Sequence, residues 1–97
     1  MFTVDKIEVE GKSFLGLKVE LEGLPPLLLV KGGKGFVMCG YLNFEAAEKV
    51  GSAAAIVSGV NSFEDVLNAE IKAVTTKAKV LGLETGRVVR EVIGFLA

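Results

Sequence analysis

Two stretches near the beginning of the chain, KIEVEG (residues 6–11) and FLGLKVELEG (residues 14–23), alternate between apolar and polar residues. A period of two is typical of β-strands that have one face on a core and the other in solvent. Ile7 and Val9 share one face of the first strand, and the apolar face of the second consists of Leu15, Leu17, Val19 and Leu21. The chain is therefore predicted to begin with a half-exposed β-hairpin.

The length of the hairpin loop decides which residues pair. A three-residue loop at residues 11–13 pairs Val9 with Leu15 and places both apolar sets on one face. A two-residue loop at residues 11–12 pairs Val9 with Phe14 and sets the apolar side of the first strand beside the charged side of the second. We therefore predict the three-residue loop.

The rest of the first half continues the sheet. The prolines of GLPP (residues 23–26) end the second strand, because proline cannot donate a hydrogen bond to a ladder. Continuous apolar runs predict two central strands, at residues 27–31 and 35–40, that are buried on both faces. The segment SAAAIVSGV (residues 52–60), rich in small residues, predicts a fifth strand.

Capping signals predict two short helices. Asn43 is a good N-cap for the helix FEAAEKV, which Gly51 ends. Ser62, with Asp65 three positions later, resembles a capping box that opens the helix FEDVLNA.

Longer apolar stripes predict two further helices. Helical spacing from Glu70 to Leu81 predicts a third helix ended by Gly82, although EIKAV at residues 70–74 also alternates like a strand. Thr85 can cap a last helix with a broad apolar arc. We expect the α+β class: a single domain over residues 1–97 with a mixed, mostly antiparallel sheet of about five strands and helices from the C-terminal half packed on it.

Composition excludes several functions. The chain has no histidine, which removes Ser-His-Asp triads, Cys-His pairs and imidazole-bound zinc. A carboxylate-only Mg²⁺ site stays open, but the spacing of the acidic residues singles none out, and we expect no metal and no cofactor. A net charge of -1 argues against nucleic-acid binding, and no run approaches the ~20 apolar residues that span a bilayer. One cysteine, and acidic residues where a secretory signal would be apolar, indicate a cytoplasmic protein. The lack of tryptophan and glutamine and the preference for Lys, Glu and Val resemble heat-adapted proteins.

The chain also carries more apolar residues than a small monomer easily hides. Hydrophobic residues make up 51% of its 97 positions. The alanine-rich segment at residues 52–60 and the broad apolar arc of the last helix both suit close packing against another subunit. We predict a homo-oligomer, either a dimer or a trimer.

The lone cysteine, in the segment MCG, is the centre of the candidate site. Cys39 can be a small buried hydrophobe, which is the favoured interpretation, a ligand-site residue at a strand end, or a nucleophile. The nucleophile is disfavoured because no histidine base can serve it. We assign no catalytic residue and expect any ligand to contact Cys39, Gly40, Asn43, Arg90 and Glu91.

Two other charged motifs have both a structural and a binding interpretation. KGGKG (residues 31–35) resembles a phosphate cradle, but Lys34 is followed by glycine and a strand instead of Ser or Thr and a helix, which favours a tight turn with glycines at positive φ. The arc Arg87, Arg90 and Glu91 is either an anion-binding surface or, as we favour, the solvated face of the last helix.

Four segments together resemble a known family: GFVMCGYLN, SFEDVLNAEIKAVT, KAKVLGLETG and REVI. They look like the small bacterial and archaeal family called domain of unknown function 1805, and the resemblance covers nearly the whole chain. The family's C-terminal pattern, close to G-M-x-G-R-E-A-L, is matched at Gly86, Arg90 and Glu91 but not at the Met or the second Gly. The resemblance implies a compact α/β domain without an assigned activity or cofactor.

The sequence is compatible with two functions. The preferred one is a non-catalytic module that binds a small molecule or a partner near MCG. The alternative is a thiol-dependent enzyme with Cys39 as nucleophile and Arg90 as its anion-binding group.

Overall fold

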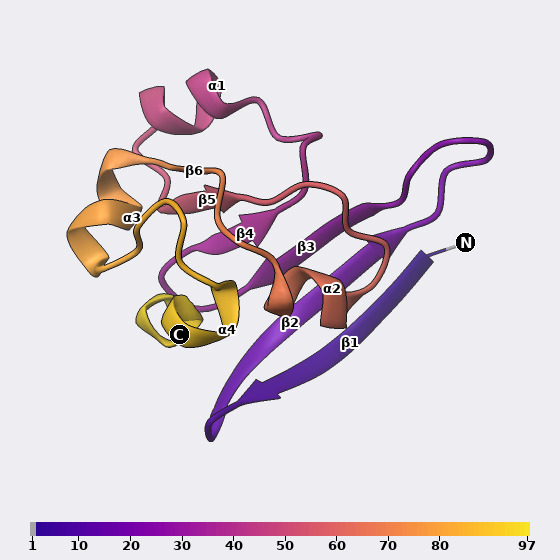
Figure 1. Cartoon of the computed structure of the whole chain (residues 1–97), viewed down its shortest axis with the longest axis horizontal. Helices are drawn as coiled ribbons and strands as arrows, with labels where there is room; N and C mark the ends of the chain where they lie inside the picture. The colour runs from indigo at the N-terminus through magenta and orange to yellow at the C-terminus, as the bar shows by residue number, and fades with distance from the viewer. Residues whose placement is uncertain (1) are drawn as a thin grey trace.

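A six-stranded mixed sheet forms the centre of the structure, a computed structural model that describes residues 2–97 (Figure 1). The strands follow one another across the sheet in chain order: β1 (Phe2–Val9), β2 (Lys12–Val19), β3 (Leu27–Lys31), β4 (Phe36–Met38), β5 (Ala54–Ile56) and β6 (Ala73–Val74). Neighbouring strands are antiparallel except β4 and β5, which are parallel. The prediction of a mixed, mostly antiparallel sheet is confirmed, with one strand more than the five expected.

Short helices fill the connections after β4. They are α1 (Phe44–Lys49) between β4 and β5, α2 (Phe63–Asn68) between β5 and β6, and α3 (Thr76–Leu81), α4 (Val89–Val92) and the 3-10 helix η1 (Ile93–Leu96) after β6. Figure 1 shows α2 and α4 on the same side of the sheet, in front of its strands. The α+β class, with helices from the C-terminal half packed on the sheet, is confirmed.

The main core lies between the sheet and these helices. Alternate side chains of the central strands are fully buried there, namely Leu28, Val30, Val37 and Ala55. They meet buried residues of the helices, among them Val66, Val89, Ile93 and Leu96. We call this side of the sheet the covered face. Asn43 caps α1 and Ser62 caps α2 as predicted, since each side-chain oxygen accepts a backbone N–H of the first helical turn.

The predicted hairpin loop is wrong. The turn contains only two residues, Glu10 at φ 51° and Gly11 at φ 80°, and it pairs Val9 with Lys12. Two central residues at positive φ give a turn whose twist matches that of the flanking strands, and this favours the shorter loop. The sequence interpretation had placed Gly11 first in the loop, whereas it is the second residue. As a consequence Phe14, not Leu15, lies on the covered face.

The opposite side of the hairpin carries exposed apolar residues over most of its length, and Lys6, Glu8 and Lys31 lie on the same side near the Glu10–Gly11 turn. Register places Phe2, Val4, Leu15, Leu17, Val19, Leu27 and Leu29 together on this side, which we call the open face. Phe2 is 63% exposed, Val4 50% and Leu15 48%. In β3 the residues that point to this side, Leu27 and Leu29, are only half-buried, so burial of the central strands on both faces is not observed there.

The helix predicted from Glu70 to Leu81 begins later. Lys72 donates its backbone N–H to Ile56 and Thr75 donates to Ala54, so the segment before Thr76 is the edge strand β6. This is the strand alternative that the sequence EIKAV also allowed. Thr75 is the N-cap of α3, and Gly82 ends the helix at φ 117° as predicted.

Thr85 does not cap the last helix. The N-cap of α4 is Val88, which makes no side-chain capping bond. The chain before α4 is held by backbone bonds instead: Gly86 donates to the Ile71 carbonyl and Val89 to the Ala69 carbonyl. Tertiary contacts therefore set where α4 begins.

The KGGKG segment is a turn, but its glycines are needed for another reason than the one predicted. Gly32, Gly33 and Gly35 are not among the glycines at positive φ. A Cβ at Gly32 would overlap the Leu96 carbonyl, and one at Gly35 would overlap the Ala53 carbonyl. Close approach of neighbouring backbone explains these two positions.

Candidate functional site

The parallel pair β4 and β5 positions the candidate site. Parallel strands have their carboxyl ends at the same edge of a sheet, and open α/β sheets tend to bind ligands there. The loop that begins at Cys39 follows β4, and the loop that begins at Val57 follows β5. Backbone bonds hold both loops at the sheet, because Cys39 donates to the Leu28 carbonyl and Val57 donates to the Met38 carbonyl.

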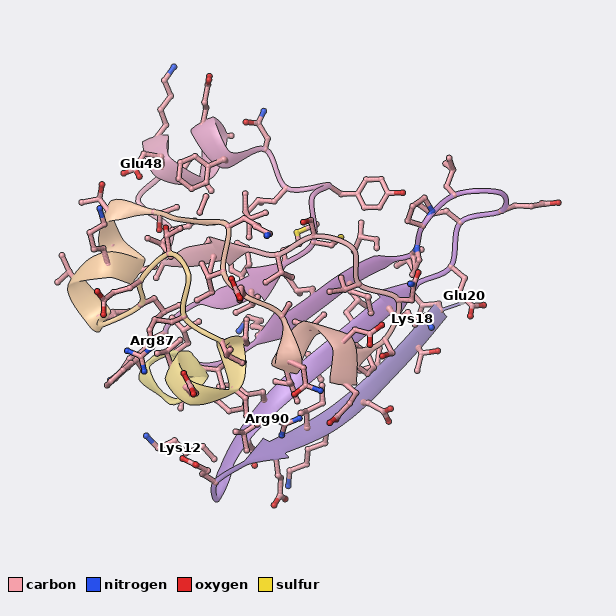
Figure 2. All side chains as sticks on the ribbon, in the orientation of Figure 1. Lys12, Lys18, Glu20, Glu48, Arg87 and Arg90 are labelled. Atoms are coloured by element: carbon pink, nitrogen blue, oxygen red, sulfur yellow. The ribbon has the colours of Figure 1, made fainter. Side chains whose placement is uncertain are left out.

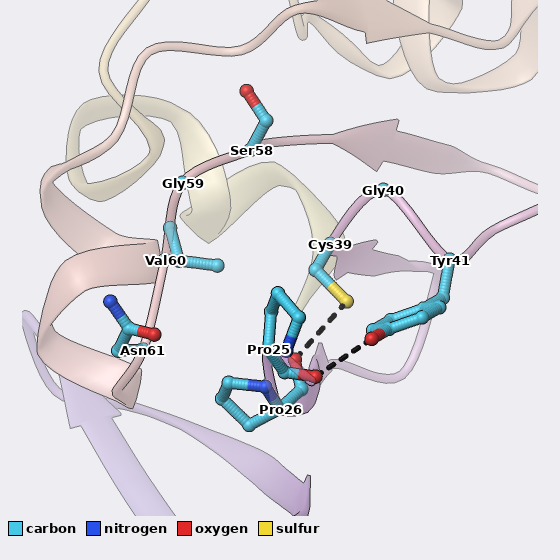
Figure 3. Close-up of a pocket in the computed structure, with 9 residues that line it drawn as sticks. All are labelled: Pro25, Pro26, Cys39, Gly40, Tyr41, Ser58, Gly59, Val60 and Asn61. Atoms are coloured by element: carbon cyan, nitrogen blue, oxygen red, sulfur yellow. Dashed lines mark hydrogen bonds between the residues drawn. The ribbon is translucent and has the colours of Figure 1, made fainter. Parts of the chain in front are cut away.

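A pocket of about 500 Å³ opens between these two loops (Figure 3). Its lining comes from both loops and from the segment before β3: Pro25, Pro26, Cys39, Gly40, Tyr41, Ser58, Gly59, Val60 and Asn61. No side chain of this lining carries a formal charge. The volume lies in the range of small-molecule sites, and mostly apolar walls with a few polar groups are typical of them.

Cys39 lies at the inner end of the pocket. Its side chain is 5% exposed, and its Sγ accepts the backbone N–H of Leu28 at 3.3 Å. The thiol also points to the Pro26 carbonyl at 3.9 Å, which Figure 3 shows as one of two dashed lines. The favoured prediction, a small buried residue, agrees with this exposure, and the same side chain contributes to the pocket wall.

Tyr41 and the two prolines form the outer wall. The Tyr41 hydroxyl donates to the Pro25 carbonyl at 2.7 Å and ties the loop after β4 to the segment before β3 (Figure 3). No signal in the sequence marked Tyr41 or the two prolines as site residues. Pro25 had signalled only the end of a strand, and no local pattern shows that it meets Tyr41.

Backbone donors are available in both loops. Among residues 2–97 the structure gives no hydrogen-bond acceptor for the N–H groups of Gly40, Ser58, Gly59 and Val60. Gly59 has φ +70° and open space at its Cβ position. These N–H groups can serve water or the oxygen of a ligand.

The remaining predicted site residues lie elsewhere. Asn43 is occupied as the cap of α1, where its Oδ1 accepts the Ala46 N–H at 3.1 Å. Arg90 links α4 to α2, since its Nη2 lies 2.7 Å from Glu64 Oε1 and its Nε donates to Asn68 Oδ1 at 3.3 Å (Figure 2). Arg90 is therefore engaged on the helical side of the molecule.

Arg90 and Glu91 line a different pocket from Cys39. This second pocket has about 190 Å³ and is formed with Lys12 and Phe95 among its lining residues. Glu91 pairs with Arg87 at 3.5 Å. The five residues predicted to form one site are therefore divided: Cys39 and Gly40 line the first pocket, Arg90 and Glu91 line the second, and Asn43 lines neither.

The described residues show neither a metal-binding cluster nor a membrane-spanning helix. Within residues 2–97, Cys, Asp and Glu side chains form no group of three or more that could hold a metal ion. In the same part of the chain no helix is long and apolar enough to cross a bilayer.

The fold and this pocket define a small α+β protein with a cavity at the carboxyl ends of its parallel strand pair. Residues 38–96 match the family described as Domain of unknown function (DUF1805), and the chain belongs to this family. The resemblance seen in the sequence is thereby confirmed.

Two relatives extend the likeness over the whole chain. A crystal structure of a protein of unknown function, TA1206 from Thermoplasma acidophilum, has a TM-score of 0.95 and 42% sequence identity, and the match covers 100% of this chain and 94% of that one. The uncharacterized protein YunC of Bacillus subtilis (strain 168) is 29% identical over 97 residues, covering 96% of this chain and 95% of YunC.

Proposed function

We propose that the chain is a non-catalytic binding module whose ligand occupies the pocket between the loops after β4 and β5. The observation that carries this proposal is the pocket itself, about 500 Å³ at the carboxyl ends of a parallel strand pair. The MCG segment is also the strand end ahead of a helix at which the sequence favours a ligand.

The lining restricts the chemistry of the ligand. Tyr41, Pro25 and Val60 offer apolar surface, and the lining contains no charged side chain. Free backbone N–H groups in the two loops suit a carbonyl or hydroxyl oxygen. The ligand is therefore a small, uncharged molecule with an apolar body and one or two oxygen acceptors.

The thiol-enzyme alternative has less support. The pocket lining contains Cys39 but no carboxylate that could act as a general base, and the chain has no histidine. Arg90, the proposed anion-binding group, is bound to Glu64 and Asn68 and lines another pocket.

Alkylation of the native protein separates the two functions. For a binding module we expect iodoacetamide to modify buried Cys39 at least about tenfold more slowly than in the urea-unfolded chain. Faster modification in the native protein than in the unfolded chain would favour the enzyme.

Ligand binding is tested by amide chemical shifts during a screen of small uncharged metabolites. We expect hits to shift the amides of Gly40 and Ser58 to Asn61, and Tyr41→Ala to abolish those shifts. Arg90→Met, a matched change outside this pocket, should leave them unchanged. Loss of binding in both variants would contradict the assignment of the site, and so would shifts centred on Arg90.

We further infer that two copies of the chain meet through the open face. The alanine-rich segment at residues 52–60 and the apolar arc of the last helix do not support an oligomer. Their residues Ala54, Ala55, Val89 and Val92 are already buried within this chain. The open face supplies a different reason. With β1 and β2 each eight residues long, this side of β1–β3 measures roughly 400 Å² in projection, and its apolar residues occupy the part away from Lys6, Glu8 and Lys31. That apolar part is a suitable centre for an interface of about 800 Å² per partner, and the three charged residues suit its polar rim.

The partner on the open face is a second copy of the chain, because two identical apolar surfaces match each other when a two-fold axis relates them. Two such faces stack about 10 Å apart in sheet-on-sheet packing. Light scattering after size exclusion should give twice the chain mass of 10.2 kDa. Leu15→Glu should give the monomer, whereas Val80→Glu, at a residue that is 81% exposed on α3, should stay dimeric. A wild-type monomer at tens of micromolar, on the order of common assay concentrations, would refute this interface.

We also propose that the protein is cytoplasmic. It is supported by the single cysteine, which is free and buried.

A further inference from the structure

A smaller pocket lies at the other end of the parallel pair, where β4 and β5 begin. It has about 230 Å³ and is formed by the KGGKG turn, the segment before β5 and one residue of α3. Its lining residues are Lys31, Gly32, Gly33, Lys34, Gly35, Phe36, Gly51, Ser52, Ala53 and Lys77. We call it the lysine pocket.

Three positively charged side chains line this pocket. Lys31 is the last residue of β3, Lys34 lies in the turn and Lys77 in α3, and the lining contains no Asp or Glu. Within residues 2–97 none of these three lysines forms an ion pair. The Lys31 ammonium has only a long contact, 3.4 Å, to the Gly32 carbonyl. The net charge of the chain is -1, so this is a local concentration of positive charge.

The glycines of the turn give a second indication. Internal packing explains Gly32 and Gly35, but it does not explain Gly33. A Cβ at Gly33 would lie 3.4 Å from Ala97, an ordinary contact, and its φ is not positive. The structure gives no acceptor among residues 2–97 for the Gly33 and Gly35 N–H groups. A missing side chain beside free N–H donors lets an anion approach the backbone closely.

We propose that the lysine pocket binds a phosphate group. Lysine ammonium groups are strong partners for phosphate oxygens, and free backbone N–H groups add hydrogen bonds of the kind that glycine-rich loops make. The site differs from a P-loop, because the turn leads into strand β4 and not into a helix. It is independent of the uncharged pocket at the carboxyl ends, with which it shares no lining residue.

Calorimetric titration of the whole chain with inorganic phosphate at low ionic strength tests the proposal. Lys34→Met and Lys77→Met should each weaken binding about tenfold, since each removes one of three charges. Lys72→Met removes the same charge from an exposed position outside the pocket and should leave the Kd unchanged. The proposal is overturned if wild type does not bind phosphate, or if Lys72→Met weakens binding as much as the other two.

A second variant tests the close approach to the turn. Gly33→Ala should keep the melting temperature of wild type, because its methyl group meets only an ordinary contact, and should weaken phosphate binding. Unchanged binding in Gly33→Ala together with unchanged binding in Lys34→Met would place the phosphate elsewhere. A parallel titration with glycerol phosphate shows which molecule supplies the phosphate group. Tighter binding than that of inorganic phosphate indicates a phosphorylated small molecule, and no binding indicates free phosphate.

Discussion

The two ends of the β4–β5 strand pair differ in the charge of the residues around their pockets. At the carboxyl ends the pocket is lined by uncharged side chains and by loops with free N–H groups. At the amino ends a smaller pocket is surrounded by three lysines. The strands contribute Lys31 and Phe36 to the smaller lining and no residue to the larger one, so the connecting segments supply most of what each end can bind with.

The two ends are also held together differently. At the amino ends the fully buried Thr75 makes three hydrogen bonds through its hydroxyl: it donates to the Ser52 carbonyl at 2.6 Å and accepts N–H groups of Ala54 and Ala78. At the carboxyl ends a thiol and an exposed tyrosine hydroxyl hold the loop after β4 to β3 and to the segment before β3. The amino ends should therefore lose more stability when their central polar side chain is removed.

The largest effect is expected for Thr75→Val. The substitution keeps the shape of the side chain but leaves one buried carbonyl and two buried N–H groups without partners, which should cost about 3 kcal/mol of unfolding free energy. Urea denaturation measures this loss. Thr75→Ser keeps the hydroxyl and loses one methyl group, which should cost about 1 kcal/mol. A valine variant as stable as the serine variant would show that the hydroxyl does not hold the amino ends together.

Cys39→Ala is the corresponding test of the carboxyl ends. It leaves a small cavity and removes the acceptor of the Leu28 N–H, which together should cost about 2 kcal/mol. Cys39→Ser, which keeps an acceptor of similar size, should recover part of this loss in the same denaturation experiment. If alanine is tolerated as well as serine, the Leu28 N–H bond contributes nothing measurable.

Tyr41→Phe should have a smaller effect. The ring is 44% exposed and its hydroxyl bond to Pro25 is open to solvent, so the loss should be about 0.5 kcal/mol. Amide exchange should nevertheless quicken in the loop after β4, because this bond holds the loop to the segment before β3. Unchanged exchange there would mean that the ring alone, through its contacts, holds the loop.

Helix caps, helix-ending glycines and the central strands were predicted correctly from short stretches of sequence. Asn43 and Ser62 cap helices because a short side-chain oxygen reaches an N–H only three residues away. Gly51 and Gly82 end helices because both adopt positive φ. The apolar runs of β3 and β4 correctly marked the central strands, although the second face of β3 is only half-buried.

Other features depend on partners that are distant in sequence. Residues 73–74 form a strand because β5 supplies backbone partners, and this outweighed a helical stripe that continues into α3. The hairpin register depended on a positive φ at Glu10, which no pattern marks. Of the site, Cys39 and Gly40 followed from a strand end, whereas Pro25 and Asn61 reach the pocket only through the tertiary fold.

The smallest expected effect concerns Glu48, which adds a second polar contact at the amino ends. Its Oε1 accepts the Thr76 N–H at the start of α3 at 2.9 Å (Figure 2 shows Glu48 at that side of the molecule). This backbone bond first, then the Thr76 hydroxyl and the charge of Lys79, hold the pKa of Glu48 below its ordinary value of 4.5. A carboxyl group whose pKa is lowered by folding stabilises the folded state above its unfolded pKa, and this stabilisation is lost as the pH falls through the folded pKa.

Glu48→Gln should therefore lower the melting temperature slightly at pH 7, and its difference from wild type should shrink as the pH falls from about 5 to about 3. Glu22→Gln makes the same change of charge at an exposed position and should show no such trend. Thermal denaturation of the three proteins across this pH range measures both. If the Glu48→Gln difference stays constant with pH, the ionised carboxylate has no special role at α3. The amino ends would then be held by Thr75 without help from Glu48.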